Sequence, residues 1–550
     1  MIVRHALINA LEHDGKADLQ AVLGRVLSEN PELRNKIKEI IPIIREVVEE
    51  INYKPMEEIK RMFEDLGITI KKKEKVEKVL PELNKTKKGK SVFRLAPYPS
   101  GPLHIGNARM VLLNDEYAKR YKGKLFLVFD DTIGSEEKFV IPEGYKLILD
   151  GLKWLDVKLT KILYKSDRLK FVYKIAEDLI KTDHAYVCEC DTETLRKNRA
   201  DGVECSHRNQ TIKENLKKWK KMLAGKYKEG QAVVRLKTDM NHANPAFRDR
   251  VLLRVVDRKH PRVGKKYKVW PLLEFSWAVD DHLLGVTHII RGKDLVIEDM
   301  MENFIWDIME WKKPEFIHYG LLNIAEAKLS KTESRKAIEQ KIYTGWDDPR
   351  TWSMQSLKRR GIQPEAVRDF AKKMGLSQAD ITVPAEILYA ENRKLIDPKS
   401  NRYFAVLDSV QISVKGAPKI KSTKSNLHPD FHKRGFRKIP VDTGNIYIEK
   451  DDYDKFLNKE VGLIDLLTAR IGGETEFVKK EVDYETPKIH WVSESNVKVK
   501  VVMSNGSVKT GIGEPSMKKI KKDQLIQLVR IGFCRVDKVG KEIVLYFAHK

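Results

Sequence analysis

Residues 94–107 read Arg94-Leu95-Ala96-Pro97-Tyr98-Pro99-Ser100-Gly101-Pro102-Leu103-His104-Ile105-Gly106-Asn107. They lead from an apolar stretch typical of a β-strand, through a turn rich in proline and glycine, into a stretch with helical periodicity. The prolines stiffen the turn, and the glycines remove side chains where a ligand must come close. Because such a turn points the free N–H groups of a helix N-terminus outward, it favours binding of a polyphosphate.

A second segment, much further along the chain, reads Lys328-Leu329-Ser330-Lys331-Thr332 and supplies compact positive charge suited to phosphates. Such a pattern arises by chance in a lysine-rich chain, but its position between residues 316–323 and the Gly-Trp-Asp-Asp-Pro-Arg segment at 345–350 is distinctive. Together the two segments resemble the two signatures of class I aminoacyl-tRNA synthetases. The residues around them narrow the resemblance to the glutamyl/glutaminyl branch in its archaeal form.

The resemblance implies an ATP site at the first segment. Its ATP-binding positions match Pro97, Gly101, His104, Gly106, Asn107 and Lys331. In the family the motif reads His-Ile-Gly-His, whereas the fourth residue here is Asn107, which can donate a hydrogen bond but cannot carry charge. The catalytic positions that the resemblance implies are His104, Lys328, Ser330 and Lys331. They would stabilise the phosphates and the leaving pyrophosphate by preorganised charge, without a protein nucleophile.

Another constellation, Phe129-Asp130-Asp131-Thr132, lies at the end of an apolar stretch. Consecutive carboxylates repel each other unless a cation or a ligand ammonium relieves the repulsion. The resemblance implies that Asp130 binds the α-amino group of the amino-acid substrate, and that Arg94 and Ala96 also belong to the glutamate site. A guanidinium such as that of Arg94 offers two parallel donors to a carboxylate. The family usually has arginine where this chain has Val128.

Specificity is expected at Arg291, within the stretch 279–292. In glutamyl enzymes the matching residue faces the side-chain carboxylate of the substrate, whereas glutaminyl enzymes carry a small neutral residue there. Arg291 therefore favours glutamate. Leu273 stands where many relatives have a substrate-contacting tyrosine, and Trp277 where bacterial relatives have asparagine.

A further cluster is formed by Cys188, Cys190, Cys205 and His207. Four such ligands in two close pairs suit a tetrahedral zinc ion, although gaps of one residue are less common than gaps of two. The pattern is compatible with a structural zinc ion or with four side chains that bind no metal. Some bacterial glutamyl enzymes carry a comparable set in the domain that receives the tRNA acceptor end.

The net charge of the chain is +25, which favours a polyanionic partner and salt-sensitive binding. A membrane surface would also fit this charge. However, the apolar runs are too short for a spanning helix and the N-terminus lacks the apolar core of a signal peptide. We therefore expect a cytoplasmic protein without a membrane partner, and a monomer.

The fold class that the resemblance implies is a multidomain α/β protein with a Rossmann-like catalytic domain. The expected parts are an N-terminal helical region with a basic linker (1–90), the two halves of the catalytic domain (91–185 and 266–335), an inserted acceptor-end domain (186–265), a helical connecting domain (336–392) and a β-barrel anticodon-binding domain (393–550). Many short strands after residue 393 independently favour β-barrels.

The implied function is ATP-dependent activation of glutamate, with Mg²⁺, and transfer of the glutamyl group to the 3′ end of tRNA(Glu). Whether tRNA(Gln) is charged as well is left open. One alternative is a glutaminyl-tRNA synthetase, against which Arg291 speaks. The other is a catalytically inactive, synthetase-like tRNA-binding protein, against which the intact His104, Lys328 and Lys331 speak.

Overall fold

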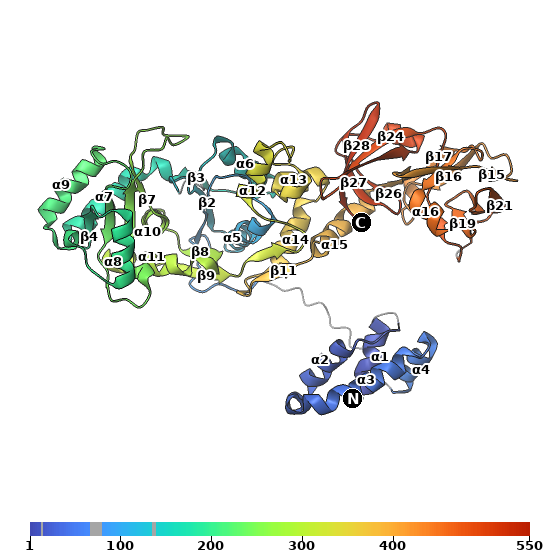
Figure 1. Ribbon diagram of the computed structural model, residues 1–550, viewed down its shortest axis with the longest axis horizontal. Helices are drawn as coiled ribbons and strands as arrows, with labels where there is room; N and C mark the ends of the chain where they lie inside the picture. Colours follow the sequence, from blue (N-terminus) through green and yellow to red (C-terminus); the bar gives the residue numbers. More distant parts are fainter. Residues whose placement is uncertain (13–14, 67–79, 135–138, 484) are drawn as a thin grey trace. The chain divides into compact units, whose positions relative to one another are not determined.

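The computed structural model describes residues 1–12, 15–66, 80–134, 139–483 and 485–550 (Figure 1). The chain divides into two compact units, Met1–Glu77 and Lys78–Lys550. No helix in these described ranges is both long enough and apolar enough to cross a membrane.

The first unit is helical, as predicted. Its helices are α1 (Ile2–Glu12), α2 (Leu19–Glu29), α3 (Ile37–Asn52) and α4 (Met56–Asp65), with the 3₁₀ helix η1 (Pro31–Lys36). In α3 the apolar residues Ile40, Ile44, Val48 and Ile51 recur at helical spacing and are all buried. They pack against α1 and α2, so this unit has a core of its own.

The second unit begins with parallel strands. The sheet β1-β2-β3 contains β1 (Val92–Leu95), β2 (Lys124–Phe129) and β3 (Lys161–Tyr164), and β8 (His288–Gly292) pairs with β9 (Glu315–Tyr319). Thr287 donates its backbone N–H to the Val92 oxygen at 3.0 Å, so β8 lies beside β1. The parallel sheet thus extends from β1 to β2 on one side and from β8 to β9 on the other. The carboxyl ends of β1 and β8 form the switch point where open parallel sheets bind ligands.

Helices cover these apolar strands. They are α5 (Ala108–Arg120), α6 (Pro142–Trp154), α10 (Leu273–Leu283) and α11 (Val296–Ile308). The main core includes Phe93 and Leu95 of β1, Leu127 of β2, and Val111 and Leu112 of α5. This packing fixes the strand ends that carry the candidate site.

An antiparallel sheet, β4-β5-β6-β7, interrupts the parallel strands. It contains β4 (Ala185–Cys188), β5 (Val233–Leu236), β6 (Val251–Val255) and β7 (Val269–Pro271), with helices α7 (Leu169–Lys181), α8 (Thr192–Asp201) and α9 (Ile212–Leu223). Trp219 of α9 is fully buried in its core. Strand β7 lies beyond residue 265, where the inserted domain was expected to end.

A mainly helical region follows. It contains β10 (Leu322–Ile324), α12 (Lys331–Glu339), α13 (Met354–Arg360), α14 (Pro364–Met374), β11 (Ile381–Val383) and α15 (Glu386–Ile396). β10 and β11 pair in parallel.

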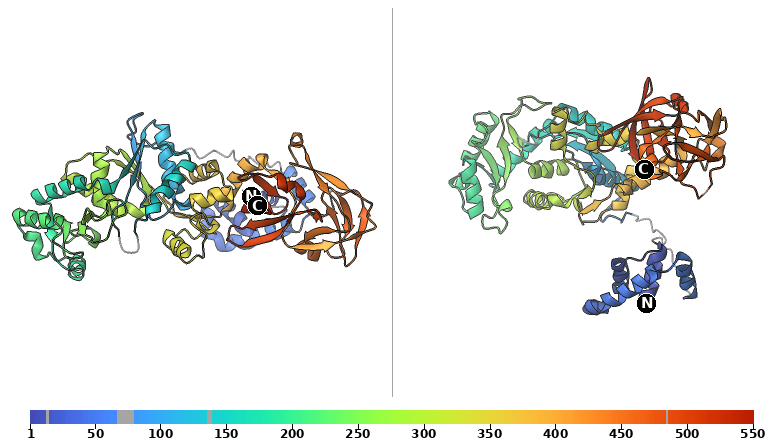
Figure 2. Two further views of the ribbon diagram at one scale, coloured as in Figure 1. Left: turned by 90° about the horizontal axis from the view of Figure 1, so that it is seen from above. Right: turned by 45° about the vertical axis from the view of Figure 1, so that its right-hand side comes forward.

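The C-terminal region is built of short strands and confirms the predicted β-barrel. One sheet has the order β12-β26-β27-β28-β24-β25-β13. Its strands are β12 (Asn401–Tyr403), β13 (Ala405–Val406), β24 (Val497–Val502), β25 (Val508–Gly513), β26 (Leu525–Leu528), β27 (Gly532–Lys538) and β28 (Glu542–His549). Its edge strands β12 and β13 are separated in the chain by Phe404 alone, so the sheet nearly closes on itself (Figure 2).

The other C-terminal sheets are β14-β18-β23, β15-β21-β20-β19-β22 and β16-β17. Their elements are β14 (Ser409–Ile412), β15 (Val414–Lys415), β16 (Ser422–Asn426), β17 (Phe436–Pro440), β18 (Ile446–Glu449), α16 (Lys450–Lys455), β19 (Glu460–Leu463), β20 (Leu467–Arg470), β21 (Thr475–Lys479), β22 (Lys488–Ile489) and β23 (Val492–Ser493). Two separate clusters of buried apolar residues, one around Trp491 and one around Val499, form the cores of this region.

Candidate active site

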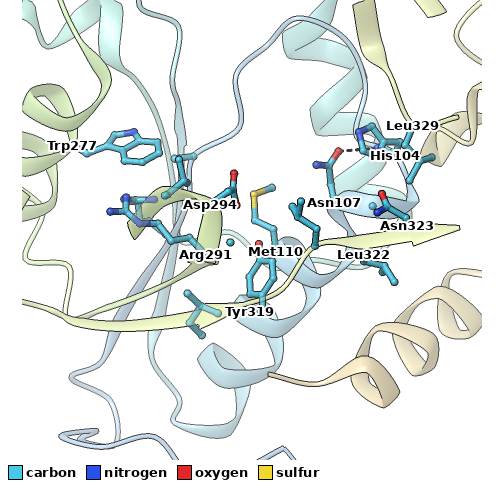
Figure 3. Close-up of a pocket in the computed structure, with 17 residues that line it drawn as sticks. His104, Asn107, Met110, Trp277, Arg291, Asp294, Tyr319, Leu322, Asn323 and Leu329 are labelled. Atoms are coloured by element: carbon cyan, nitrogen blue, oxygen red, sulfur yellow. Dashed lines mark hydrogen bonds between the residues drawn. The ribbon is translucent and has the colours of Figure 1, made fainter. Parts of the chain in front are cut away.

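A cavity of about 330 Å³ opens where the carboxyl ends of β1 and β8 meet (Figure 3). Of the predicted site residues, those lining it are Arg94, Ala96, His104, Gly106, Asn107 and Arg291. His104, Ser330 and Lys331 line a small neighbouring hollow. Pro97, Gly101, Asp130 and Lys328 line neither. The structure therefore brings the two signatures and Arg291 together around one site.

The glycines of the first signature permit close contacts with later parts of the chain. A Cβ atom on Gly106 would lie 3.0 Å from Leu329 of the second signature. A Cβ atom on Gly101, whose φ is +154°, would lie 2.9 Å from the ring of Trp346. Both positions therefore need glycine for the two signatures and the 345–350 segment to pack together.

The departure at Asn107 has a structural consequence. Its Oδ1 accepts a hydrogen bond at 3.1 Å from the backbone N–H of His104, at the start of the 3₁₀ helix η2 (Ile105–Asn107). The amide oxygen thus fixes this turn, and Figure 3 shows the bond. Burial and the nearby Lys331 lower the pKa of His104 to about 3, so its imidazole is neutral at physiological pH.

The two lysines of the second signature differ in their surroundings. Ser330 caps α12 by accepting a hydrogen bond from the Glu333 N–H at 3.3 Å, and Lys331 is the first residue of that helix. Burial lowers the pKa of Lys331 to about 8. The Lys328 side chain is 80% exposed and pairs with Glu333 at 2.8 Å. Lys331 therefore adjoins His104 in the site, whereas Lys328 points to solvent.

Arg94 and Arg291, which were expected to contact the amino acid, each pair with acidic residues of the chain itself. Arg94 donates to Asp281 through Nε at 2.7 Å and Nη2 at 2.9 Å, and both side chains are buried. Arg291 donates through Nη2 to Glu302 at 2.9 Å and also pairs with Asp299. Such buried pairs compensate the loss of hydration that each charge would otherwise suffer.

Arg291 nevertheless retains hydrogen-bonding capacity. Its Nε and Nη1 atoms are buried and have no hydrogen-bond partner among the described residues. Buried donors without a partner are uncommon, and Arg291 is one of the residues that line the cavity. Burial raises the pKa of the neighbouring Glu302 to about 7.

Asp130 lies apart from the cavity lining and is 2% exposed. Its Oδ1 pairs with the Nζ of Lys165 at 3.3 Å. Sequence reasoning missed this lysine, as it missed Glu302 and the pairing of Asp281. The sequence did contain a feature that indicates Lys165. It is a charged residue directly after an apolar strand, and the carboxyl ends of such parallel strands form the edge of the sheet where ligands bind.

The cysteine and histidine side chains form one cluster. The ligand atoms of Cys188, Cys190, Cys205 and His207 all lie within 4.8 Å of one another. The Cys188 and Cys205 sulfurs are 3.8 Å apart, and the Cys190 sulfur lies 3.4 Å from Nδ1 of His207. This cluster could hold a metal ion.

Comparison with known proteins agrees with this arrangement. Residues 90–398 match the family described as tRNA synthetases class I (E and Q), catalytic domain, and residues 400–487 and 488–537 match two anti-codon binding domain families of the same synthetases. A protein named Glutamate--tRNA ligase from Pyrococcus abyssi is 45% identical over 570 residues, covering 100% of this chain and 99% of that protein. One of the same name from Methanocaldococcus jannaschii is 42% identical over 556 residues, covering 99% of each.

The fold, the paired signatures and these matches define an ATP-dependent aminoacyl-tRNA ligase of class I. The chain belongs to the class I tRNA synthetases for glutamate and glutamine. Within that family its full-length relatives are glutamate--tRNA ligases, which confirms the predicted glutamyl type.

Proposed function

We propose that this chain activates glutamate with ATP, as the Mg²⁺ complex, and transfers the glutamyl group to the 3′ end of tRNA(Glu). The observation that carries the choice of glutamate is Arg291, which lines the cavity and has two donors without a partner among the described residues. A side-chain carboxylate would satisfy both donors with charge-assisted hydrogen bonds.

The residues around the nucleotide have distinct roles in this proposal. The glutamate α-carboxylate attacks the α-phosphate of ATP, and pyrophosphate leaves. His104, being neutral, donates one N–H to a phosphate oxygen. Lys331, beside the helix N-terminus of α12, stabilises the negative charge that moves onto the leaving group. The C-terminal region would contact the anticodon.

The proposal is tested by aminoacylation with purified tRNA(Glu) and tRNA(Gln), each with glutamate and glutamine. We expect glutamate to be charged onto tRNA(Glu), and the assay also decides whether tRNA(Gln) accepts glutamate. Charging with glutamine in preference to glutamate would favour the glutaminyl alternative. Tight tRNA binding without any charging would favour an inactive binding protein.

The charge of Lys331 predicts the pH dependence of activation. Because its pKa is lowered to about 8, the ammonium is lost as the pH rises above that value. We expect kcat/KM for ATP in pyrophosphate exchange to fall above about pH 8. Lys331→Arg keeps its charge and should move this fall to higher pH. A wild-type profile that stays flat to pH 10 would contradict the assignment.

We also propose that the cysteine cluster binds a structural zinc ion. Tetrahedral zinc with Zn–S bonds of about 2.3 Å places its sulfurs about 3.8 Å apart, which is the separation of Cys188 and Cys205. Arg235 Nη1 lies 3.8 Å from the Cys205 sulfur and 3.9 Å from that of Cys188. Its positive charge would offset the excess negative charge of three thiolates around Zn²⁺.

Elemental analysis tests the zinc site. Protein purified without chelator is expected to contain about one zinc ion per chain, and Cys205→Ser should lose most of it. Cys534→Ser is the matched control, because this cysteine is buried in the C-terminal barrel far from the cluster in sequence. Wild-type protein without metal would remove the proposal.

A further inference from the structure

Lys165 is a buried lysine at the ligand edge of the parallel sheet. Phe129 of β2 pairs in register with Tyr164 of β3, so the next residues, Asp130 and Lys165, lie side by side beyond the strand ends. Lys165 is 2% exposed. Its Nζ donates to the Ser276 hydroxyl at 2.6 Å and lies 3.3 Å from Oδ1 of Asp130. The chain itself therefore places an ammonium on this carboxylate.

The surroundings of Lys165 belong to the amino-acid site. Its Nζ lies 5.0 Å from the ring centre of Trp277, and the guanidinium carbons of Arg94 and Arg291 each lie 4.8 Å from the same ring. Trp277 lines the cavity. A ligand held by Arg94 and Arg291 would therefore have its α-ammonium close to the ammonium of Lys165.

A second carboxylate is available to Lys165. Oδ1 of Asp280 accepts a hydrogen bond from Arg168 at 2.6 Å, whereas its Oδ2 is buried without a partner among the described residues. Burial lowers the pKa of Lys165, and Asp280 is, after Asp130, one of the carboxylates that oppose this shift and favour its ammonium form. A long lysine side chain can therefore leave Asp130 without becoming an uncompensated buried charge.

We propose that Lys165 is a specificity-determining residue of the amino-acid site. Without substrate, its ammonium pairs with Asp130 and so takes the position of the substrate α-ammonium. When the amino acid binds, the Lys165 ammonium moves toward Asp280. The inference rests on the proposed function, since the resemblance assigns the α-amino group to Asp130. A ligand with both carboxylates but no amino group has nothing with which to displace Lys165. The lysine thus sets how much affinity the α-ammonium contributes.

Calorimetric binding of glutamate and of glutarate, which has the same two carboxylates and no amino group, to the full chain tests this inference. Lys165→Met keeps the apolar stem and removes the charge. Asp130 then has no competing ammonium, so the ratio of the glutarate Kd to the glutamate Kd should rise at least tenfold. An unchanged ratio, within about threefold, would overturn the inference.

The variant Ser276→Ala distinguishes displacement of the Lys165 side chain from the effect of removing its charge. It removes the 2.6 Å hydrogen bond that holds Lys165 but leaves every charge in place. Displacement then becomes easier, so the ratio should rise by about threefold or more, whereas a purely electrostatic effect predicts no change. This variant also replaces Lys165→Met if that protein fails to fold.

The same preparations are assayed for charging of tRNA(Glu). Wild-type protein that charges glutamate while both variants keep the wild-type binding ratio would refute only the role of Lys165. Wild-type protein that neither binds glutamate nor charges tRNA would refute the proposed function, and the role of Lys165 with it. A crystal structure with glutamate should show Nζ near Oδ2 of Asp280; Nζ still on Asp130 would contradict the displacement.

Discussion

Lys331→Ala is expected to lower kcat for glutamate activation by about 10²–10³, with the KM for glutamate changed by less than about threefold. The ammonium lies beside His104 at the start of α12, away from the groups assigned to the amino acid. Its charge matters most as negative charge moves onto the leaving pyrophosphate. An interaction made mainly in the transition state lowers kcat rather than affinity.

The measurement is pyrophosphate exchange with tRNA(Glu) present. Lys336→Ala is a matched control, because Lys336 is an exposed lysine on the same helix and outside the site. It should behave like the wild type. An unaltered kcat with only a raised glutamate KM in Lys331→Ala would show that this lysine contacts the amino acid instead.

Local sequence pattern was sufficient for the strand that precedes the first signature and for the C-terminal region. The apolar stretch that opens the first signature is the end of strand β1, and the short strands expected after residue 393 are present as β12 to β28. The glycines of the first signature also predicted that another group comes close to the backbone there. In the structure the group next to Gly106 is Leu329 of the second signature. Such features depend on residues near in sequence or on a strongly restricted backbone.

The charge pairs of the amino-acid site could not be predicted in the same way. Arg94 meets Asp281, Asp130 meets Lys165, and Arg291 meets Glu302, each across a change of element. Periodicity shows that a charged residue ends a strand, but not which opposite charge lies beside it. The sheet register and the packing of α10 and α11 decide those partners.

Arg291→Ala should lower kcat/KM for glutamate at least tenfold and shift the glutamate-to-glutamine preference toward glutamine. Charge-assisted hydrogen bonds to the γ-carboxylate contribute about 1.5–3 kcal/mol, and the γ-amide of glutamine carries no charge to lose. Removing Arg291 also leaves Glu302 and Asp299 without their cation, which destabilises a buried site by about 3–5 kcal/mol. Thermal unfolding of the variant must therefore accompany the kinetics. An unchanged preference in folded protein would show that Arg291 does not bind the γ-carboxylate.

Glu302→Gln is the matched variant, and we expect it to change the glutamate-to-glutamine preference in the opposite direction to Arg291→Ala. In the wild type, Arg291 Nη2 donates to Glu302 at 2.9 Å, and a glutamine at this position can still accept that hydrogen bond. The glutamine carries no charge, so it neither neutralises the guanidinium nor repels a substrate carboxylate. At pH 8, where the Glu302 carboxylate with its pKa of about 7 is charged, the glutamate preference should rise about fivefold over the wild type. Below pH 7 the wild-type Glu302 becomes protonated and neutral, so the two proteins should converge. Because Arg291→Ala and Glu302→Gln move one ratio in opposite directions, a shared loss of stability cannot imitate the result. A fall of the preference in Glu302→Gln would mean that the γ-carboxylate is not bound by Arg291.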